Sequence, residues 1–276
     1  MTDSAAFRAK HKDDVRQVQE VSEGALHLFH RLRPKAPETQ PARFRDIIFG
    51  SVEIGESTTR AITTLLAQDQ HLPAIALVRV RLEQLIVASY LVHEQPEVGL
   101  KPYAAFVPIT EYQVSKAVLA EPFLAPHVQG RIQVDDLRAK AFAAQLDINP
   151  GFDIKDGKLQ AKWTPLDLYS MAVKRDTLVD KATFVISRHF PLAGLYTSFY
   201  KAASSVVHAD ASALASPFRG TLKSDDRTLE IDAATFWRLL LPALVMTYDL
   251  IQCYEGLRWT GLNCDREFLS LLSQLR

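Results

Sequence analysis

The stretch AIALVRVRLEQLIVASYLV, residues 74–92, decides the fold. It follows Pro73 and carries aliphatic side chains on nearly every face of a helix, with few polar interruptions. A helix that is apolar on all sides is buried on several of them, because water around an exposed apolar face costs free energy. The sequence therefore predicts a central helix against which the rest of the chain packs.

Other segments repeat apolar residues at three- and four-residue spacing, which is typical of amphipathic helices. The expected helices are residues 14–32, 44–66, 103–119, 134–146, 165–175 and 178–187, one from Pro191 through Tyr200 to about Ala213, and one from Asp232 to Leu257, bent at Pro242. Around Asp156–Gly157, apolar and polar residues alternate, which predicts a small β-hairpin insertion near residues 152–162. The expected fold class is all-α, an antiparallel helical bundle. It forms a single domain over residues 1–276, with residues 1–13 disordered.

Composition and charge exclude several classes of protein. The chain has 276 residues, of which 47% are hydrophobic and 23% charged, and this excludes disorder of the whole chain. The formal net charge is zero, so no overall attraction to nucleic acid or to an anionic membrane exists. The most apolar run, residues 239–248, is too short to span a bilayer. The two cysteines, Cys253 and Cys264, lack the clustered spacing of a zinc or redox site, and no secretory signal is visible, so a cytoplasmic protein is expected.

Arg79 and Glu83 are the first candidate site residues. They lie four positions apart on the central helix and therefore share one face, where their charges can pair. Such a pair either clamps the helix to a neighbour or lines a cleft, with Arg79 binding an anion and Glu83 orienting it or acting as general base. Arg81 points the other way and is expected in solvent or at an interface.

The second candidate group is Ser204, Ser205 and His208, which lie on a polar stripe of a later helix together with Thr197 and Lys201. A polar stripe is commonly the solvated face of a helix. The functional alternative is that His208, which titrates near neutral pH, acts as a general acid or base. The two candidate groups predict one polar centre with a contact between Glu83 and His208.

Metal and cofactor sites are not expected. His27, His30 and Glu23 share a face, but the interpretation favoured for them is a solvated surface. The chain has no Walker loop, dinucleotide glycine fingerprint or His-Glu-x-x-His motif. Tyr196, Tyr200 and the other scattered aromatic residues are interpreted as core residues.

The order of these motifs resembles an uncharacterised bacterial family, domain of unknown function 5677, among the HEPN-like helical proteins. The resemblance rests on Arg-x-x-x-Glu (Arg79, Glu83), a lone tryptophan (Trp163) and Tyr-x-x-x-Ser-Ser-x-Val-His (Tyr200 to His208), and it covers residues 74–217. It implies a HEPN-like bundle. Many members of the wider group are dimeric, metal-independent ribonucleases of defence or toxin–antitoxin systems.

Two functions are open, and the resemblance implies the first of them. In the first, the chain is a metal-independent ribonuclease or nucleotide-processing protein with Arg79, Glu83, Ser204, Ser205 and His208 as catalytic residues and RNA or a nucleotide as partner. No arginine is followed by histidine after four to six residues, so Arg79 and His208 would rebuild the usual motif across two helices. In the second, the chain is a non-catalytic module that binds a protein or forms a homodimer, and the same residues are structural.

Overall fold

The computed structural model describes residues 4–68, 70–128, 130–149, 158–200, 203–204, 220–224, 227–231 and 233–275. They are mainly helical, which confirms the predicted helical class. The chain divides into two compact units, residues 1–93 with 168–276 and residues 94–167. The single domain expected from the sequence stays a prediction, since two compact units can belong to one domain.

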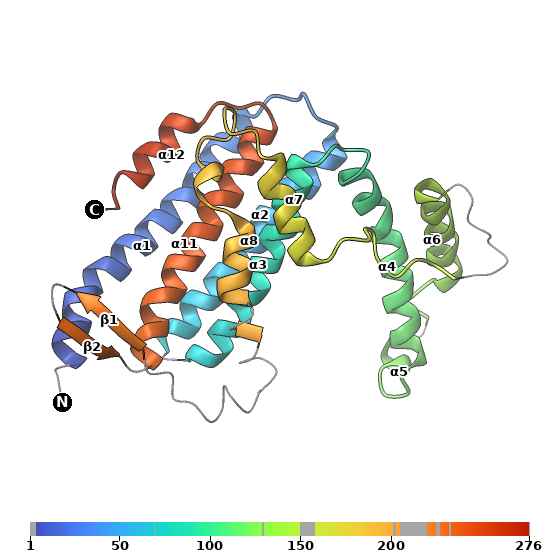
Figure 1. Ribbon diagram of the computed structural model, residues 1–276. Helices are drawn as coiled ribbons and strands as arrows, with labels where there is room; N and C mark the ends of the chain where they lie inside the picture. Colours follow the sequence, from blue (N-terminus) through green and yellow to red (C-terminus); the bar gives the residue numbers. More distant parts are fainter. Residues whose placement is uncertain are drawn as a thin grey trace. The chain divides into compact units, whose positions relative to one another are not determined.

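The larger unit is built on four long helices (Figure 1). They are α1 (Ser4–Leu32), α2 (Ala42–Ala67), α3 (His71–His93) and α11 (Ala233–Trp259). The shorter elements are α7 (Leu168–Leu178), a 3-10 turn (Ser187–His189), α8 (Leu192–Leu195), a π-helical turn (Tyr196–Tyr200) and α12 (Asp265–Leu272). Helix α1 starts at Ser4, inside the segment expected to be disordered.

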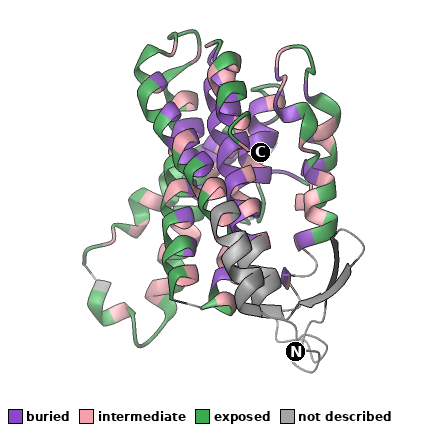
Figure 2. Ribbon diagram, turned by 90° about the vertical axis from the view of Figure 1, so that its left-hand side faces the viewer, coloured by how far each residue is buried: buried purple, intermediate pink, exposed green. Residues whose placement is uncertain are grey.

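Helix α3 is the central helix that the sequence predicts. It packs against α2, α7 and α11, and most of its side chains are buried (Figure 2). Ile75, Leu82 and Ile86 are 0% exposed. The large apolar area that these side chains remove from water stabilises the bundle.

The direction of α11 differs from the antiparallel arrangement expected. Helices α1, α2 and α3 alternate in direction, but α11 runs parallel to α1 (Figure 1). Ser22 near the middle of α1 contacts Asp249 near the middle of α11, and Thr39, shortly after α1, contacts Thr260 just after α11. The long connection between α3 and α11 allows this, because only short connections force neighbouring helices to run antiparallel.

The smaller unit contains α4 (Leu100–Ala120), α5 (Ala125–Val128) and α6 (Val134–Ile148). Helices α4 and α6 pack together around Ile109, Ala141 and Ala144. Near them the Tyr103 and Trp163 rings meet edge to face, with centroids 5.2 Å apart.

The predicted hairpin near residues 152–162 is not found in the part of this segment that the structure describes. Residues 158–162 form no strand, and residues 150–157 lie outside the described ranges. The backbone of Gln160 is used differently: its N–H donates to Gln145 Oε1 (2.9 Å) and its carbonyl accepts from Gln113 Nε2 (3.2 Å). Side chains of two helices therefore take the bonds that a partner strand would make.

A hairpin does occur later in the chain. Strands β1 (Gly220–Ser224) and β2 (Arg227–Ile231) pair antiparallel, with Leu222 opposite Leu229. Among the described residues, no helix is sufficiently long and apolar to cross a membrane.

Candidate functional site

Arg79 and Glu83 on α3 meet the hydroxyl of Tyr200. The Arg79 guanidinium donates a hydrogen bond to Tyr200 Oη (2.9 Å), and this hydroxyl donates to Glu83 Oε1 (2.8 Å). Arg79 Nε also lies 3.3 Å from Glu83 Oε1. The three side chains therefore form a closed polar triangle, called the Arg79 triangle below, in which a neutral hydroxyl bridges a cation and an anion.

Tyr200 reaches this position from a widened helical turn. Helix α8 begins after Pro191, and the carboxylate of Asp176 accepts the N–H groups of Leu192 and Ala193 (both 2.9 Å). The chain then continues as the π-helical turn Tyr196–Tyr200. A π-turn shifts the side chains that follow it relative to an α-helix, and such turns are frequent at functional sites.

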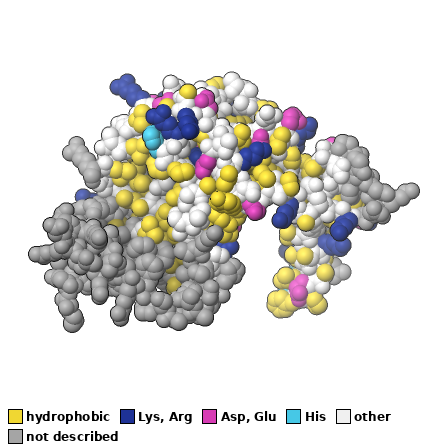
Figure 3. Space-filling view, in the orientation of Figure 1, with side chains coloured by type: hydrophobic (Ala, Val, Ile, Leu, Met, Phe, Trp, Pro, Cys, Tyr) yellow, Lys and Arg dark blue, Asp and Glu magenta, His cyan; other side chains and the backbone are white. Residues whose placement is uncertain are grey.

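Three tyrosines continue outward from the Arg79 triangle. The rings of Tyr196 and Tyr200 are stacked, 4.4 Å apart and inclined by 14°, and Tyr169 lies 5.5 Å from Tyr196. Arg79 Cζ sits 4.8 Å from the centre of the Tyr200 ring, in a cation–π contact. Hydrophobic-type side chains, which include tyrosine, gather on the face where α8 lies (Figure 3). Tyr196 and Tyr200 are half-buried and stacked on each other, and Tyr169 is 45% exposed. The fold therefore gathers these tyrosines in a partly exposed stack, and the interpretation of Tyr196 and Tyr200 as scattered core residues is wrong.

The proton states in the triangle are fixed by its contacts. The hydrogen bond with Tyr200 raises the pKa of Arg79 above its already high ordinary value. This effect outweighs burial, which lowers the pKa. Burial raises the pKa of Tyr200 as well, although the bond from Arg79 works against this. At neutral pH, Arg79 is therefore a cation and Tyr200 a neutral hydroxyl that can both donate and accept.

The second predicted group is described only in part. Ser204 lies in a short helical stretch, residues 203–204, and is half-buried. Ser205 and His208 lie outside the described residues, and so does the expected contact between Glu83 and His208. Tyr200 belongs to the Tyr-x-x-x-Ser-Ser motif, but the sequence led to its interpretation as a core residue and not as a site residue. Its position four residues before Ser204 was the signal in the sequence that could have identified it as a site residue.

Arg81, which the sequence placed in solvent or at an interface, is not exposed to solvent. Its side chain is 1% exposed and pairs with Asp249, which is 0% exposed, at 2.9 Å. The same carboxylate accepts from Ser22 Oγ (2.6 Å) and Thr59 Oγ1 (2.9 Å). Gly55 on α2 leaves space for the guanidinium, since a Cβ there would lie 2.7 Å from Arg81 Cζ. The pair is a structural clamp between α3 and α11.

A second buried charge cluster surrounds Glu255 on α11. Its carboxylate pairs with Arg175 of α7 and lies 3.1 Å from His93 Nε2 of α3, and all three side chains are at most 2% exposed. Burial alone would raise the pKa of Glu255, but Arg175 and His93 outweigh burial and hold it well below the ordinary value. Glu255 is therefore ionised and ties three helices together.

No group of three or more His, Cys, Asp or Glu side chains among the described residues is arranged to hold a metal ion. His30, one of the histidines considered from the sequence, lies 2.8 Å from Glu56 of α2 instead.

Comparison with known protein families gives a match. The model of a family described as a family of unknown function (DUF5677) matches residues 56–228, more than half of the chain. This range contains the segment from which the resemblance was drawn, together with Arg79, Glu83 and Tyr200. No curated protein and no solved structure matches.

Proposed function

The chain belongs to the DUF5677 family of unknown function, and we propose that it is a metal-independent ribonuclease or nucleotide-processing protein centred on the Arg79 triangle. A HEPN-like ancestry, a bacterial cytoplasmic setting and a role in defence or a toxin–antitoxin system are parts of this proposal, and the motif resemblance supports them. RNA or a nucleotide is the proposed ligand, with a homodimer as the proposed active form.

Solvent access is the observation that supports this function most. The side chains of Arg79 and Glu83 are 19% and 34% exposed, whereas the structural arginines Arg81 and Arg175 are 1% exposed. The bundle is therefore clamped by other ion pairs, and the Arg79 triangle is accessible to a ligand. A polar cluster on a partly open surface is a functional-site candidate.

The proposed roles follow from the chemistry of each group. The ribose 2′-oxygen attacks phosphorus and the bond from phosphorus to the 5′-oxygen breaks; His208 acts as general base on the 2′-hydroxyl or as general acid on the leaving 5′-oxygen, and Arg79 stabilises the negative charge that develops on the phosphate oxygens. Ser204 or Ser205, together with Glu83, orients these two groups. Glu83 and Tyr200 are positioning residues in this scheme, because their bonds to the guanidinium fix its direction before the ligand arrives.

The tyrosine stack supports RNA or a nucleotide as the ligand. Base stacking on an aromatic ring contributes about 1–3 kcal/mol and tolerates any base. Tyr169, at the outer end of the stack, is 45% exposed. A phosphate at Arg79 would place the neighbouring base near these rings.

The test is cleavage of a labelled, mixed-sequence single-stranded RNA by the full-length protein in the presence of EDTA. We expect products with 2′,3′-cyclic phosphate ends, and we expect Arg79→Ala and His208→Ala each to slow cleavage by roughly 100-fold or more. Tyr200→Phe keeps the ring stack but removes both hydroxyl bonds, so a loss of about tenfold is expected.

Arg16→Ala is the matched control. Arg16 forms an exposed pair with Glu20 four residues on, at 3.5 Å, and its removal should leave the cleavage rate unchanged. The alternative, a non-catalytic interaction module, predicts no cleavage by the unaltered protein and a lower melting temperature for His208→Ala. Under the proposed function, His208→Ala keeps the melting temperature and loses cleavage.

A further inference from the structure

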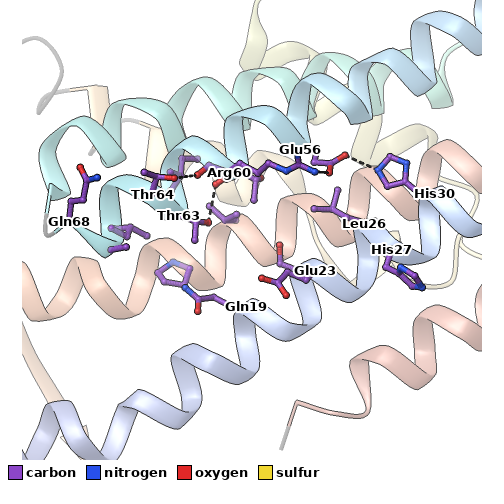
Figure 4. A pocket seen from close by; sticks show the side chains of 17 residues that line it. Gln19, Glu23, Leu26, His27, His30, Glu56, Arg60, Thr63, Thr64 and Gln68 are labelled. Carbon is purple, nitrogen blue, oxygen red and sulfur yellow. Dashed lines mark hydrogen bonds and ion pairs between the residues drawn. The ribbon is translucent and has the colours of Figure 1, made fainter.

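A cavity of about 820 Å³ opens between α1 and α2, above α11 (Figure 4). It shares no residue with the Arg79 triangle. Pockets for small molecules commonly measure about 300–1,000 Å³ and are lined mainly by apolar side chains. The apolar part of this lining comprises Leu26, Ile62, Leu66, Ala67, Pro242 and Val245.

The floor of the cavity is held rigidly. Ser22 on α1 and Thr59 on α2 line it, and both donate to the carboxylate of Asp249 beneath (2.6 and 2.9 Å). Because Asp249 is also bound to Arg81 at 2.9 Å, the two walls are fixed to one buried anchor. The cavity therefore exists before a ligand arrives, which lowers the entropic cost of binding.

The charges at the rim are unevenly paired. Glu56 lies 2.8 Å from His30 across the groove and also pairs with Arg60 on its own helix, so the charge of Arg60 is compensated. Glu23 of α1 also lines the cavity, and it makes no hydrogen bond or ion pair within the part of the chain that the structure describes. In Figure 4 no dashed line reaches its carboxylate. Among the described rim residues, Glu23 is thus a carboxylate without a paired cation.

We propose that this cavity binds a small amphipathic cation, whose apolar body lies against the apolar wall and whose ammonium group pairs with Glu23. The proposal is independent of the function assigned to the Arg79 triangle. An anionic ligand is disfavoured, because Arg60 is already paired and Glu23 would repel it.

Dansylcadaverine is a suitable probe, because it joins an aromatic body to a primary amine and its fluorescence increases in an apolar site. We expect the full-length protein to enhance this fluorescence with a saturable binding curve. Glu23→Gln should weaken binding by roughly two- to fivefold, the range for an exposed ion pair. High salt should weaken binding to the unaltered protein and leave Glu23→Gln nearly unaffected.

Two further variants make the result specific. Glu20→Gln removes a carboxylate from the same helix that does not line the cavity, and it should bind the probe as the unaltered protein does. Ala67→Trp fills the cavity from an exposed position at the end of α2 and should abolish binding. The melting temperature of each variant establishes that it is folded.

Several results would overturn the proposal. They are an absence of saturable binding to the unaltered protein, equal affinity of Glu23→Gln and Glu20→Gln, or unchanged binding by Ala67→Trp. A dansyl carboxylic acid of the same length that binds as tightly as the amine would also overturn it. None of these outcomes bears on RNA cleavage, so the two proposals stand or fall separately.

Discussion

Replacing Arg81 by methionine tests whether the buried pair with Asp249 clamps the bundle. Methionine keeps much of the volume of the arginine stem but removes the charge. The carboxylate of Asp249, at 0% exposure, then keeps only its bonds to the Ser22 and Thr59 hydroxyls. A buried carboxylate without a cation is costly because water no longer solvates it.

The size of the effect follows from this burial. Removing one partner of a buried ion pair costs about 3–5 kcal/mol, and the two remaining hydroxyl bonds place Arg81→Met near the lower value. At about 2–4 °C per kcal/mol, the melting temperature should fall by roughly 6–12 °C. Arg79→Met is the matched variant on the same helix. Its partner Glu83 is 34% exposed, so the expected cost is at most about 1 kcal/mol.

The stability lost in Arg81→Met should depend on pH, in a direction set by the pKa of Asp249. Burial raises the pKa of Asp249 even beside Arg81, and the loss of Arg81 should raise it further. A carboxyl whose pKa is raised on folding binds its proton more tightly in the folded state. Such a carboxyl therefore lowers the stability of the fold as pH rises above the pKa of aspartate in the unfolded chain, about 3.9. The loss of stability caused by Arg81→Met should thus be smaller at pH 5 than at pH 7.5.

Thermal unfolding followed by circular dichroism at both pH values measures these effects. Arg81→Met/Asp249→Asn should recover much of the loss, because asparagine still accepts the hydroxyl bonds but carries no charge. A loss below 1 kcal/mol for Arg81→Met, or a double variant no more stable than the single one, would refute the reasoning.

Three other predictions follow from buried groups. Burial would raise the pKa of Glu255, but its contacts with Arg175 and His93 hold this pKa below the ordinary range. The ionised carboxylate therefore stabilises the fold fully above about pH 4.3 and less as pH falls, and Glu255→Gln should flatten the acid-side loss of melting temperature. Burial raises the pKa of Cys264 to about 12, so Ellman's reagent at pH 8 should modify it only after unfolding in urea. Gly55→Ala should lower the melting temperature, because the new Cβ would lie 2.7 Å from Arg81 Cζ. Gly50→Ala should raise the melting temperature slightly, because a Cβ at that helical position meets no atom within 4 Å.

Helices were predictable where one segment carries its own pattern. The apolar run 74–92 lies within α3, and the periodic segments correspond to α1, α2, α4, α6 and α11. The hairpin expected near residues 152–162 is not found in the part of this segment that the structure describes. Alternation around Asp156–Gly157 predicts a local turn, but the backbone of Gln160, which follows it, bonds to side chains of α4 and α6.

The candidate site was predictable in part. The four-residue spacing of Arg79 and Glu83 correctly indicated that their charges lie side by side. Spacing gave no means of knowing which arginine is buried, because Arg79 and Arg81 have similar apolar neighbours in the sequence. The structure buries Arg81, which was expected in solvent or at an interface, and leaves Arg79 partly exposed.

The sequence by itself determined the helical class, the central helix and the family to which the chain belongs, because these depend on local periodicity and short motifs. Only the tertiary structure decided the partners of the charges. Asp249 and Tyr200 are 168 and 121 positions away from the arginines they contact, and the parallel course of α11 brings Asp249 to Arg81. The physical reason is that a buried charge is stabilised by whatever group the packing of distant helices places beside it, and no local pattern encodes that choice.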